Sequence, residues 1–83
     1  MSRVRLEFTV EPFSEGRPGP HVRAAIDAVA ARGLTVDMGP FSSSADGDIA
    51  VAGDAVADLL RAAFGAGASR VALQVSTVGE AAS

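Results

Sequence analysis

Apolar and polar side chains alternate strictly over residues 4–11, which restricts this segment to one kind of element. Every second position is apolar, and the set is Val4, Leu6, Phe8 and Val10. Successive side chains of a β-strand point to opposite faces, so the pattern predicts a strand with one buried face. Pro12 and the Gly- and Pro-containing stretch Ser14–Gly19 then predict a loop.

Pro20 predicts the start of a helix, because the fixed φ of proline suits the first helical position. Apolar residues follow at helical spacing and predict one buried stripe: Val22, Ala25, Ile26 and Val29. Gly33 predicts a left-handed cap, and Arg32 is expected in the last turn, where a cation is favoured.

A second strand is predicted over residues 34–38, where Leu34, Val36 and Met38 alternate with polar residues. It stops at Gly39-Pro40. A short third strand is expected around Ser42–Ala45, and Asp46-Gly47-Asp48 is expected to combine a turn with a helix cap.

The second helix is predicted to begin at Ile49 and to end near Gly65–Gly67. Its apolar positions are Ile49, Ala52, Val56, Leu59, Leu60, Ala63 and Phe64. The alternative makes residues 48–52 the third strand and starts the helix at Asp54; the longer helix is favoured. A last strand follows, with Val71, Leu73 and Val75 apolar, and residues 79–83 are expected to fray.

This order predicts an α+β fold, a ferredoxin-like βαββαβ two-layer sandwich with a four-stranded antiparallel sheet, in a single domain over residues 1–83. Two helices can cover only one face of that sheet. The other face receives Arg5, Glu7, Thr9, Thr35, Asp37, Gln74 and Ser76. Because most of these side chains are short, the face is interpreted as plain surface, a subunit contact or the floor of a ligand site.

Composition narrows the classes of partner. The net charge is −3, all seven cationic side chains are Arg, and they form no cluster, so no nucleic-acid partner is expected. No apolar run approaches the roughly 18 residues of a membrane span, and the start lacks a signal-peptide core. We therefore expect a cytoplasmic protein with no membrane partner.

The chain lacks the usual parts of a catalytic or metal site. It has no Cys and one His, His21, which is expected to face solvent in the first turn of its helix. A triad of His21 with a serine of Ser42–Ser44 and an aspartate has no supporting motif. Asp46-Gly47-Asp48 lacks the further ligands of a calcium loop. We expect no enzyme activity, no metal and no cofactor.

The segment Gly39–Ser44 is the most unusual part of the chain. Gly39-Pro40 predicts a rigid bend, Phe41 offers an aromatic face, and three serine hydroxyls can donate and accept hydrogen bonds. Such a cluster suits an aromatic ligand with polar edges. A serine-rich hairpin loop is the alternative interpretation.

The run Gly33–Pro40, followed by Ser42–Asp48, resembles the YkoF-like thiamine/hydroxymethylpyrimidine-binding family. Phe8–Pro12 is similar to the end of that family's first strand, and Gly67–Val71 to the entry into its last strand. The similarity covers nearly the whole chain. Ala45 replaces a larger apolar residue of the family pattern, and Asp46 replaces Glu.

The resemblance implies a non-catalytic protein that binds thiamine or its pyrimidine half and assembles into dimers or tetramers through open sheet faces. By position, the family's hydroxyl residues correspond to Ser42, Ser43, Ser44 and Thr9. A stacking role for Phe41 is our own inference. Asp37 or Glu7 would neutralise the thiazolium, and Ser43, Thr9 or Gln74 would meet the aminopyrimidine edge.

Two other classes remain open. A regulatory module similar in outline to ACT-type domains would bind another small metabolite at strand–helix loops such as Ser14–Gly19. An enzyme of unknown reaction is the third class. The lone His21 and the absence of Cys and Lys argue against it.

Overall fold

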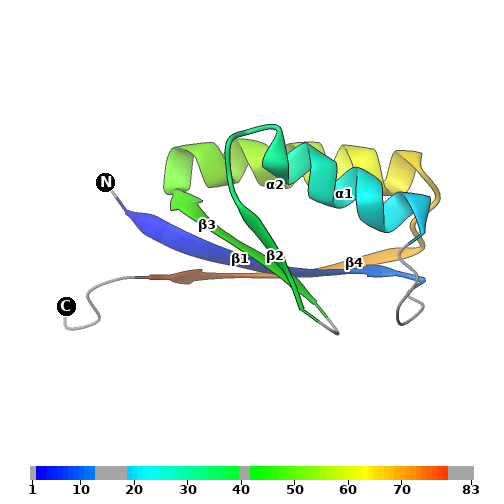
Figure 1. Cartoon of the computed structure of the whole chain (residues 1–83), viewed down its shortest axis with the longest axis horizontal. Helices are drawn as coiled ribbons and strands as arrows, with labels where there is room; N and C mark the ends of the chain where they lie inside the picture. The colour runs from blue at the N-terminus through cyan, green and yellow to red at the C-terminus, as the bar shows by residue number, and fades with distance from the viewer. Residues whose placement is uncertain (1, 13–18, 40–41, 79–83) are drawn as a thin grey trace.

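The computed structural model describes residues 2–12, 19–39 and 42–78. Six elements follow one another in the order predicted from the sequence (Figure 1). They are β1 (Arg3–Glu11), α1 (Pro20–Ala30), β2 (Val36–Met38), β3 (Ser43–Asp48), α2 (Ile49–Gly65) and β4 (Arg70–Thr77). Phe41 and residues 79–83 lie outside the described residues, so their predicted roles are not addressed by the structure.

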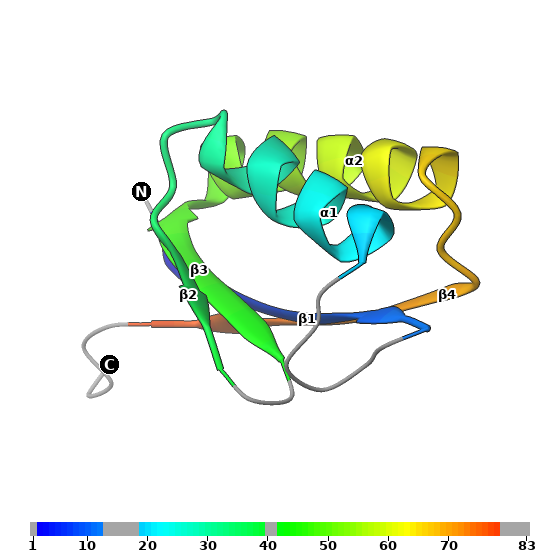
Figure 2. The same cartoon turned by 45° about the vertical axis from the view of Figure 1, so that its right-hand side comes forward.

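The four strands form one antiparallel sheet in the order β2-β3-β1-β4. Both helices pack on the same face of this sheet, giving two layers (Figures 1 and 2). This arrangement confirms the predicted ferredoxin-like α+β fold. The opposite face, here called the open face, is not covered by either of the two helices that the structure describes.

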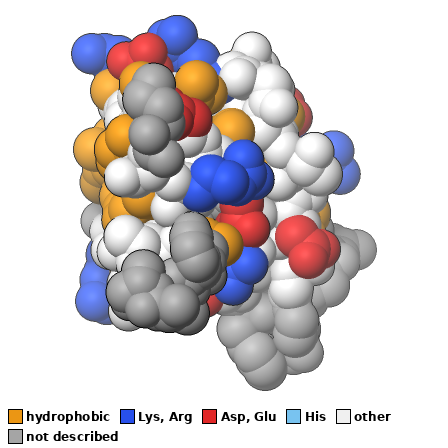
Figure 3. Space-filling view, turned by 90° about the vertical axis from the view of Figure 1, so that its left-hand side faces the viewer, with side chains coloured by type: hydrophobic (Ala, Val, Ile, Leu, Met, Phe, Trp, Pro, Cys, Tyr) orange, Lys and Arg blue, Asp and Glu red, His pale blue; other side chains and the backbone are white. Residues whose placement is uncertain are grey.

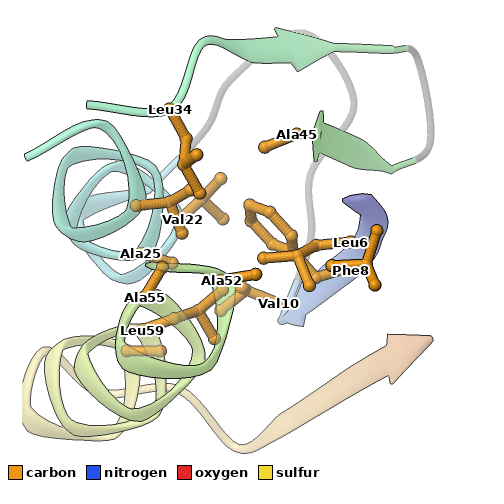
Figure 4. Packing of buried hydrophobic residues seen from close by; sticks show 13 residues of the cluster. Leu6, Phe8, Val10, Val22, Ala25, Leu34, Ala45, Ala52, Ala55 and Leu59 are labelled. Carbon is orange, nitrogen blue, oxygen red and sulfur yellow. The ribbon is translucent and has the colours of Figure 1, made fainter. Parts of the chain in front are cut away.

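The core lies between the helices and the two central strands (Figure 4). Every apolar residue predicted to alternate in β1 is at most 5% exposed: Val4, Leu6, Phe8 and Val10. Leu59 of α2 and Val29 of α1 are fully buried against them. Because β4 supplies none of the buried core residues, the core is centred on β1 and β3.

Helix α2 begins where the longer of the two predicted helices begins. The Asp48 side chain accepts a hydrogen bond from the Ala50 backbone N–H at 3.1 Å, as expected of an N-cap. The turn predicted at residues 46–48 is wrong, however, because all three residues belong to β3. There Gly47 faces the core, and the Leu34 side chain occupies the space that a Cβ at Gly47 would need.

The connection after α1 differs in part from the prediction. Gly33 has the expected left-handed conformation, with φ 88°. Helix α1 ends at Ala30, so Arg32 lies beyond it rather than in its last turn. The Arg32 guanidinium instead donates from Nε to Asp58 of α2 at 2.6 Å, which ties the connection to the second helix.

Five large apolar residues expected in the core are exposed: Met38, Ile49, Leu60, Phe64 and Val75. The buried stripe of α2 consists of Ala52, Ala55, Leu59 and Ala63. These mostly small side chains bring the helix close to the sheet, while the neighbouring stripe points past it. Part of the apolar set predicted for the core therefore lies on the surface.

Candidate ligand-binding site

A row of polar side chains crosses all four strands on the open face. Ser44 of β3 lies opposite Asp37 of β2 on one side and Glu7 of β1 on the other, and Glu7 lies opposite Gln74 of β4. Residues opposite one another in an antiparallel sheet project from the same face. Neighbouring strands are about 4.8 Å apart, so the strands that carry the two carboxylates are separated by roughly 10 Å.

The three consecutive serines do not share one environment. Ser43 lies opposite Phe8 and Met38 on the helix-covered face and is 7% exposed. Its neighbours Ser42 and Ser44 retain access to solvent. The contact predicted between Ser43 and a ligand on the open face is therefore not available, because a strand sends adjacent side chains to opposite faces.

Two hollows share Glu7 as a lining residue. The smaller, of about 310 Å³, is lined by Thr9, Ser42 and Gln74, together with Ala72 and parts of the neighbouring strands. The larger, of about 790 Å³, is lined by Asp37 and Ser44 and extends to Arg32 and Leu34 after α1 and to Val51 of α2. The structure thus gathers five of the predicted site residues around Glu7: Thr9, Asp37, Ser42, Ser44 and Gln74.

An ion pair between β1 and β3 lies in the lining of the larger hollow. The Arg5 guanidinium donates from Nε to Asp46 at 2.8 Å and from Nη2 at 3.1 Å. This hydrogen-bonded contact lowers the pKa of Asp46 below its ordinary value and raises the pKa of Arg5. The charge of Arg5 is thereby balanced by Asp46. No ion pair among the described residues includes Glu7 or Asp37.

The sequence prediction did not include the Arg5–Asp46 pair. Both residues were visible, Arg5 as a member of the open face and Asp46 as a turn residue. Their contact depends on the β1–β3 register, in which Arg5 lies opposite Asp46. Alternation in β1 reveals which side chains share a face, but it carries no information about their partners on another strand.

His21 lies in the helical layer, where its Nε2 forms a hydrogen bond with the Pro12 backbone carbonyl. It is therefore on the other layer from the open-face serines. Among the described residues, no three His, Asp or Glu side chains are grouped so as to hold a metal ion. Most of the alternative loop site at residues 14–19 lies outside the described residues.

None of the helices in the described part of the chain is long and apolar enough to cross a membrane.

Known structures share this fold. A domain of unknown function from Bacillus cereus is 24% identical, with a TM-score of 0.68, over 95% of this chain and 77% of that one. A hypothetical protein from Methanocaldococcus jannaschii is 18% identical, with a TM-score of 0.69, over 96% and 82%. A candidate thiamine biosynthesis/salvage protein from Thermotoga maritima is 20% identical, with a TM-score of 0.55, over 96% and 86%.

Among curated proteins, none matches this sequence. The family model described as "Thiamine-binding protein" matches residues 6–78, which include all of β2, β3 and β4 and most of β1. The match confirms the resemblance carried by the Gly39-Pro40 and Asp46–Asp48 segments. The chain therefore belongs to the thiamine-binding protein family.

Proposed function

We propose that this protein binds thiamine or its hydroxymethylpyrimidine half on the open face, without chemical conversion of the ligand. The observation that carries the proposal is the row Asp37–Ser44–Glu7–Gln74, found in a chain of the thiamine-binding family. The row combines two carboxylates with a hydroxyl and an amide on a rigid sheet. Thiamine needs these groups, because it joins a cationic thiazolium to a hydrogen-bonding aminopyrimidine.

The carboxylates of Glu7 and Asp37 supply the charge that the thiazolium requires. Opposite charges about 4 Å apart attract by about 4 kcal/mol at the effective dielectric of a protein surface. Arg5 does not cancel this attraction, because Asp46 already holds its guanidinium. The ring therefore lies over the acidic part of the row, away from the Arg5–Asp46 pair.

The aminopyrimidine end meets the hydroxyl and amide groups at the other hollow. Ser42 and Gln74 line it together with Thr9, and each of these side chains offers both a donor and an acceptor. Phe41 lies outside the described residues, and we keep for it the stacking role on the ring that the sequence suggested. Ser43 has no part in this arrangement, because it faces the core.

The open face also fits association with a second copy. A thiamine molecule on a flat sheet stays half exposed, whereas two facing sheets enclose it. The open face carries several short side chains, among them Thr9, Ser44 and Ser76, which favour such an approach and the formation of a dimer or tetramer. A cytoplasmic location accords with a binder of a soluble vitamin.

Isothermal titration with thiamine and with hydroxymethylpyrimidine tests the proposal. Ser44→Ala removes one hydrogen bond worth about 1 kcal/mol and should weaken binding by roughly fivefold. Ser43→Ala is the matched control, one residue away on the opposite face, and should leave the dissociation constant unchanged. Equal effects of both substitutions would contradict the site.

The charge requirement is tested separately. Asp37→Asn should weaken thiamine binding more than hydroxymethylpyrimidine binding, because only thiamine carries the positive ring. Asp27→Asn makes the same change on exposed α1 and should affect neither ligand. If neither compound binds wild-type protein below millimolar concentration, the proposed function is wrong.

A further inference from the structure

The side chains that β1 presents on the open face change in character along the strand. From the end of β1 to its start, these alternate residues are Thr9, Glu7, Arg5 and Arg3. Alternate residues of a strand project from the same face, and their Cα atoms are about 7 Å apart. One face of a single strand therefore presents a hydroxyl, then a carboxylate, then two guanidinium groups.

The two guanidinium groups lie in the larger hollow. Arg3 and Arg5 line it together with Thr35, while Glu7 lines both hollows and Thr9 lines the smaller one. The two hollows thus follow β1 along the open face and reach its start. Figure 3 views the molecule from this end, and basic and acidic side chains lie next to one another near the middle of the view.

Among the described residues, Arg3 is the one arginine of the larger hollow that belongs to no ion pair. The other two, Arg5 and Arg32, are each hydrogen-bonded to an aspartate. Arg3 lies opposite Asp48 in the β1–β3 register, but that carboxylate accepts a hydrogen bond from the first turn of α2. The N–H donors of Arg3 can therefore serve a ligand in the hollow.

The proposed ligand extends one of its groups towards Arg3. Thiamine carries a hydroxyethyl arm on the side of the thiazolium that is opposite to the pyrimidine. With the pyrimidine near Thr9 and the thiazolium near Glu7, this arm points along β1 towards Arg5 and Arg3. The hydroxyl of thiamine has no charge to offer a guanidinium, whereas a phosphate ester of that hydroxyl does.

We propose that the preferred ligand is thiamine monophosphate and that Arg3 binds its phosphate group. This inference rests on the proposed function, because the position of the ring decides where the arm ends. A guanidinium can donate two parallel hydrogen bonds to a phosphate, which makes arginine well suited to this group. Arg5 can add a further donor, because its contact with Asp46 uses Nε and Nη2 and leaves Nη1.

The charges of the larger hollow fit a ligand that carries both signs. Its described lining contains four acidic residues and three arginines. Glu7 lies at the thiazolium end of β1, whereas Arg3 and Arg5 lie at the other end. An isolated phosphate fits this arrangement poorly, because Asp46 and Asp48 stand opposite the two arginines and repel an anion. Recognition of the phosphate should therefore require the cationic ring in the same molecule.

Isothermal titration of the full chain with thiamine and with thiamine monophosphate tests this inference. Wild-type protein should bind the phosphate ester about tenfold more tightly than thiamine. Arg3→Gln should abolish this preference and leave the dissociation constant for thiamine unchanged, because Arg3 lies beyond the ring. Arg3→Lys keeps the charge without the planar fork, so it should retain only part of the preference.

Arg23→Gln is the matched control. It makes the same change on an exposed residue of α1 that lines neither hollow, so the preference should stay complete.

Salt dependence gives a second readout that needs no substitution. Raising the ionic strength from about 0.01 M to about 1 M shortens the Debye length from about 30 Å to about 3 Å. The preference of wild-type protein for the phosphate ester should therefore become smaller. Inorganic phosphate at the same concentration as thiamine monophosphate should not displace it.

The outcomes separate this inference from the proposed function. Arg3 does not bind a phosphate if thiamine binds as tightly as its phosphate ester, or if the preference survives Arg3→Gln in a variant with native circular dichroism. In either case the binding of thiamine still supports the proposed function. If neither compound binds wild-type protein, the proposed function is wrong and this inference is wrong with it.

Discussion

A shift of one residue along a strand decides which face of the sheet a side chain occupies, as the three serines Ser42, Ser43 and Ser44 show. Identical side chains follow one another, yet only Ser43 enters the core, opposite Phe8. The sequence could not reveal this, because the buried positions of β3 are Ser43, Ala45 and Gly47 rather than large apolar residues. Without an apolar alternation, the facing of β3 is known only from its pairing with β1.

The pair of Arg5 and Asp46 predicts a change of stability with pH. The pKa of Asp46 is lowered in the folded protein, so its contribution is fully present above the ordinary value of 3.8. It is lost as the pH falls below 3.8 and through the lower folded-state pKa. Urea unfolding should therefore show Asp46→Asn less stable than wild type at pH 7, with a smaller difference near pH 2.5.

Arg5→Gln provides the control for this prediction. This substitution removes the other partner of the same hydrogen bonds. The difference in free energy of unfolding between the variant and wild type should therefore become smaller over the same pH range. A gap that stays constant from pH 7 to pH 2.5 for both variants would show that the ion pair does not stabilise the fold.

At the scale of the elements, the helix starts and the alternating strands were predictable, and β3 was only partly so. Asp46-Gly47-Asp48 has the composition of a turn, and the prediction followed composition. In the structure Gly47 serves packing instead, because Leu34 fills the space beside it. Such a contact joins two elements and is not visible in either segment alone.

Substitutions at two glycines, one packed against Leu34 and one on the open side of a helix, test whether Gly47 is required for packing. Gly47→Val should destabilise the protein by about 1–3 kcal/mol, because its side chain would displace buried Leu34. Gly53→Ala should stabilise it by up to about 1 kcal/mol, since a Cβ there meets nothing within 4 Å and alanine favours the helix. Chemical denaturation measures the free energy of unfolding of both variants. If both substitutions changed it in the same direction, the packing role assigned to Gly47 would be wrong.

Helix α2 also shows the limit of periodicity. Its apolar residues extend around two adjacent stripes, and helical spacing alone does not say which stripe is covered. The uncovered one became apparent only when the position of β4 was known. The sequence prediction assigned both stripes to burial, whereas the structure exposes Ile49, Leu60 and Phe64.

For the whole molecule, the element order and the family could be predicted, because both depend on segments read along the chain. Assembly into dimers or tetramers through the open faces stays a prediction, since one sequence and one copy do not describe the relative position of two copies. A chain of 83 residues buries only about 60–65% of the surface that its unfolded form exposes, so its free energy of unfolding is modest. Any bound partner increases that free energy by a large fraction.

Ligand binding should therefore have a large effect on thermal stability. Thiamine at 100 times its dissociation constant adds about 2.7 kcal/mol, which should raise the Tm by roughly ten degrees or more for a domain of this size. Differential scanning calorimetry at fixed protein concentration measures the shift. Choline, a cation without the pyrimidine, should produce a much smaller one, and equal shifts would mean that charge alone is recognised.

Strand β1 contributes to both faces of the sheet, with Leu6 and Phe8 in the core and Glu7 and Thr9 on the other side. The core contacts and the proposed ligand contacts thus come from alternate residues of the same strand. Because both sets of residues belong to the same strand, we expect that warming yields no folded form that lacks the proposed binding site. Deleting a single residue from this strand would exchange the two sets and abolish both properties together.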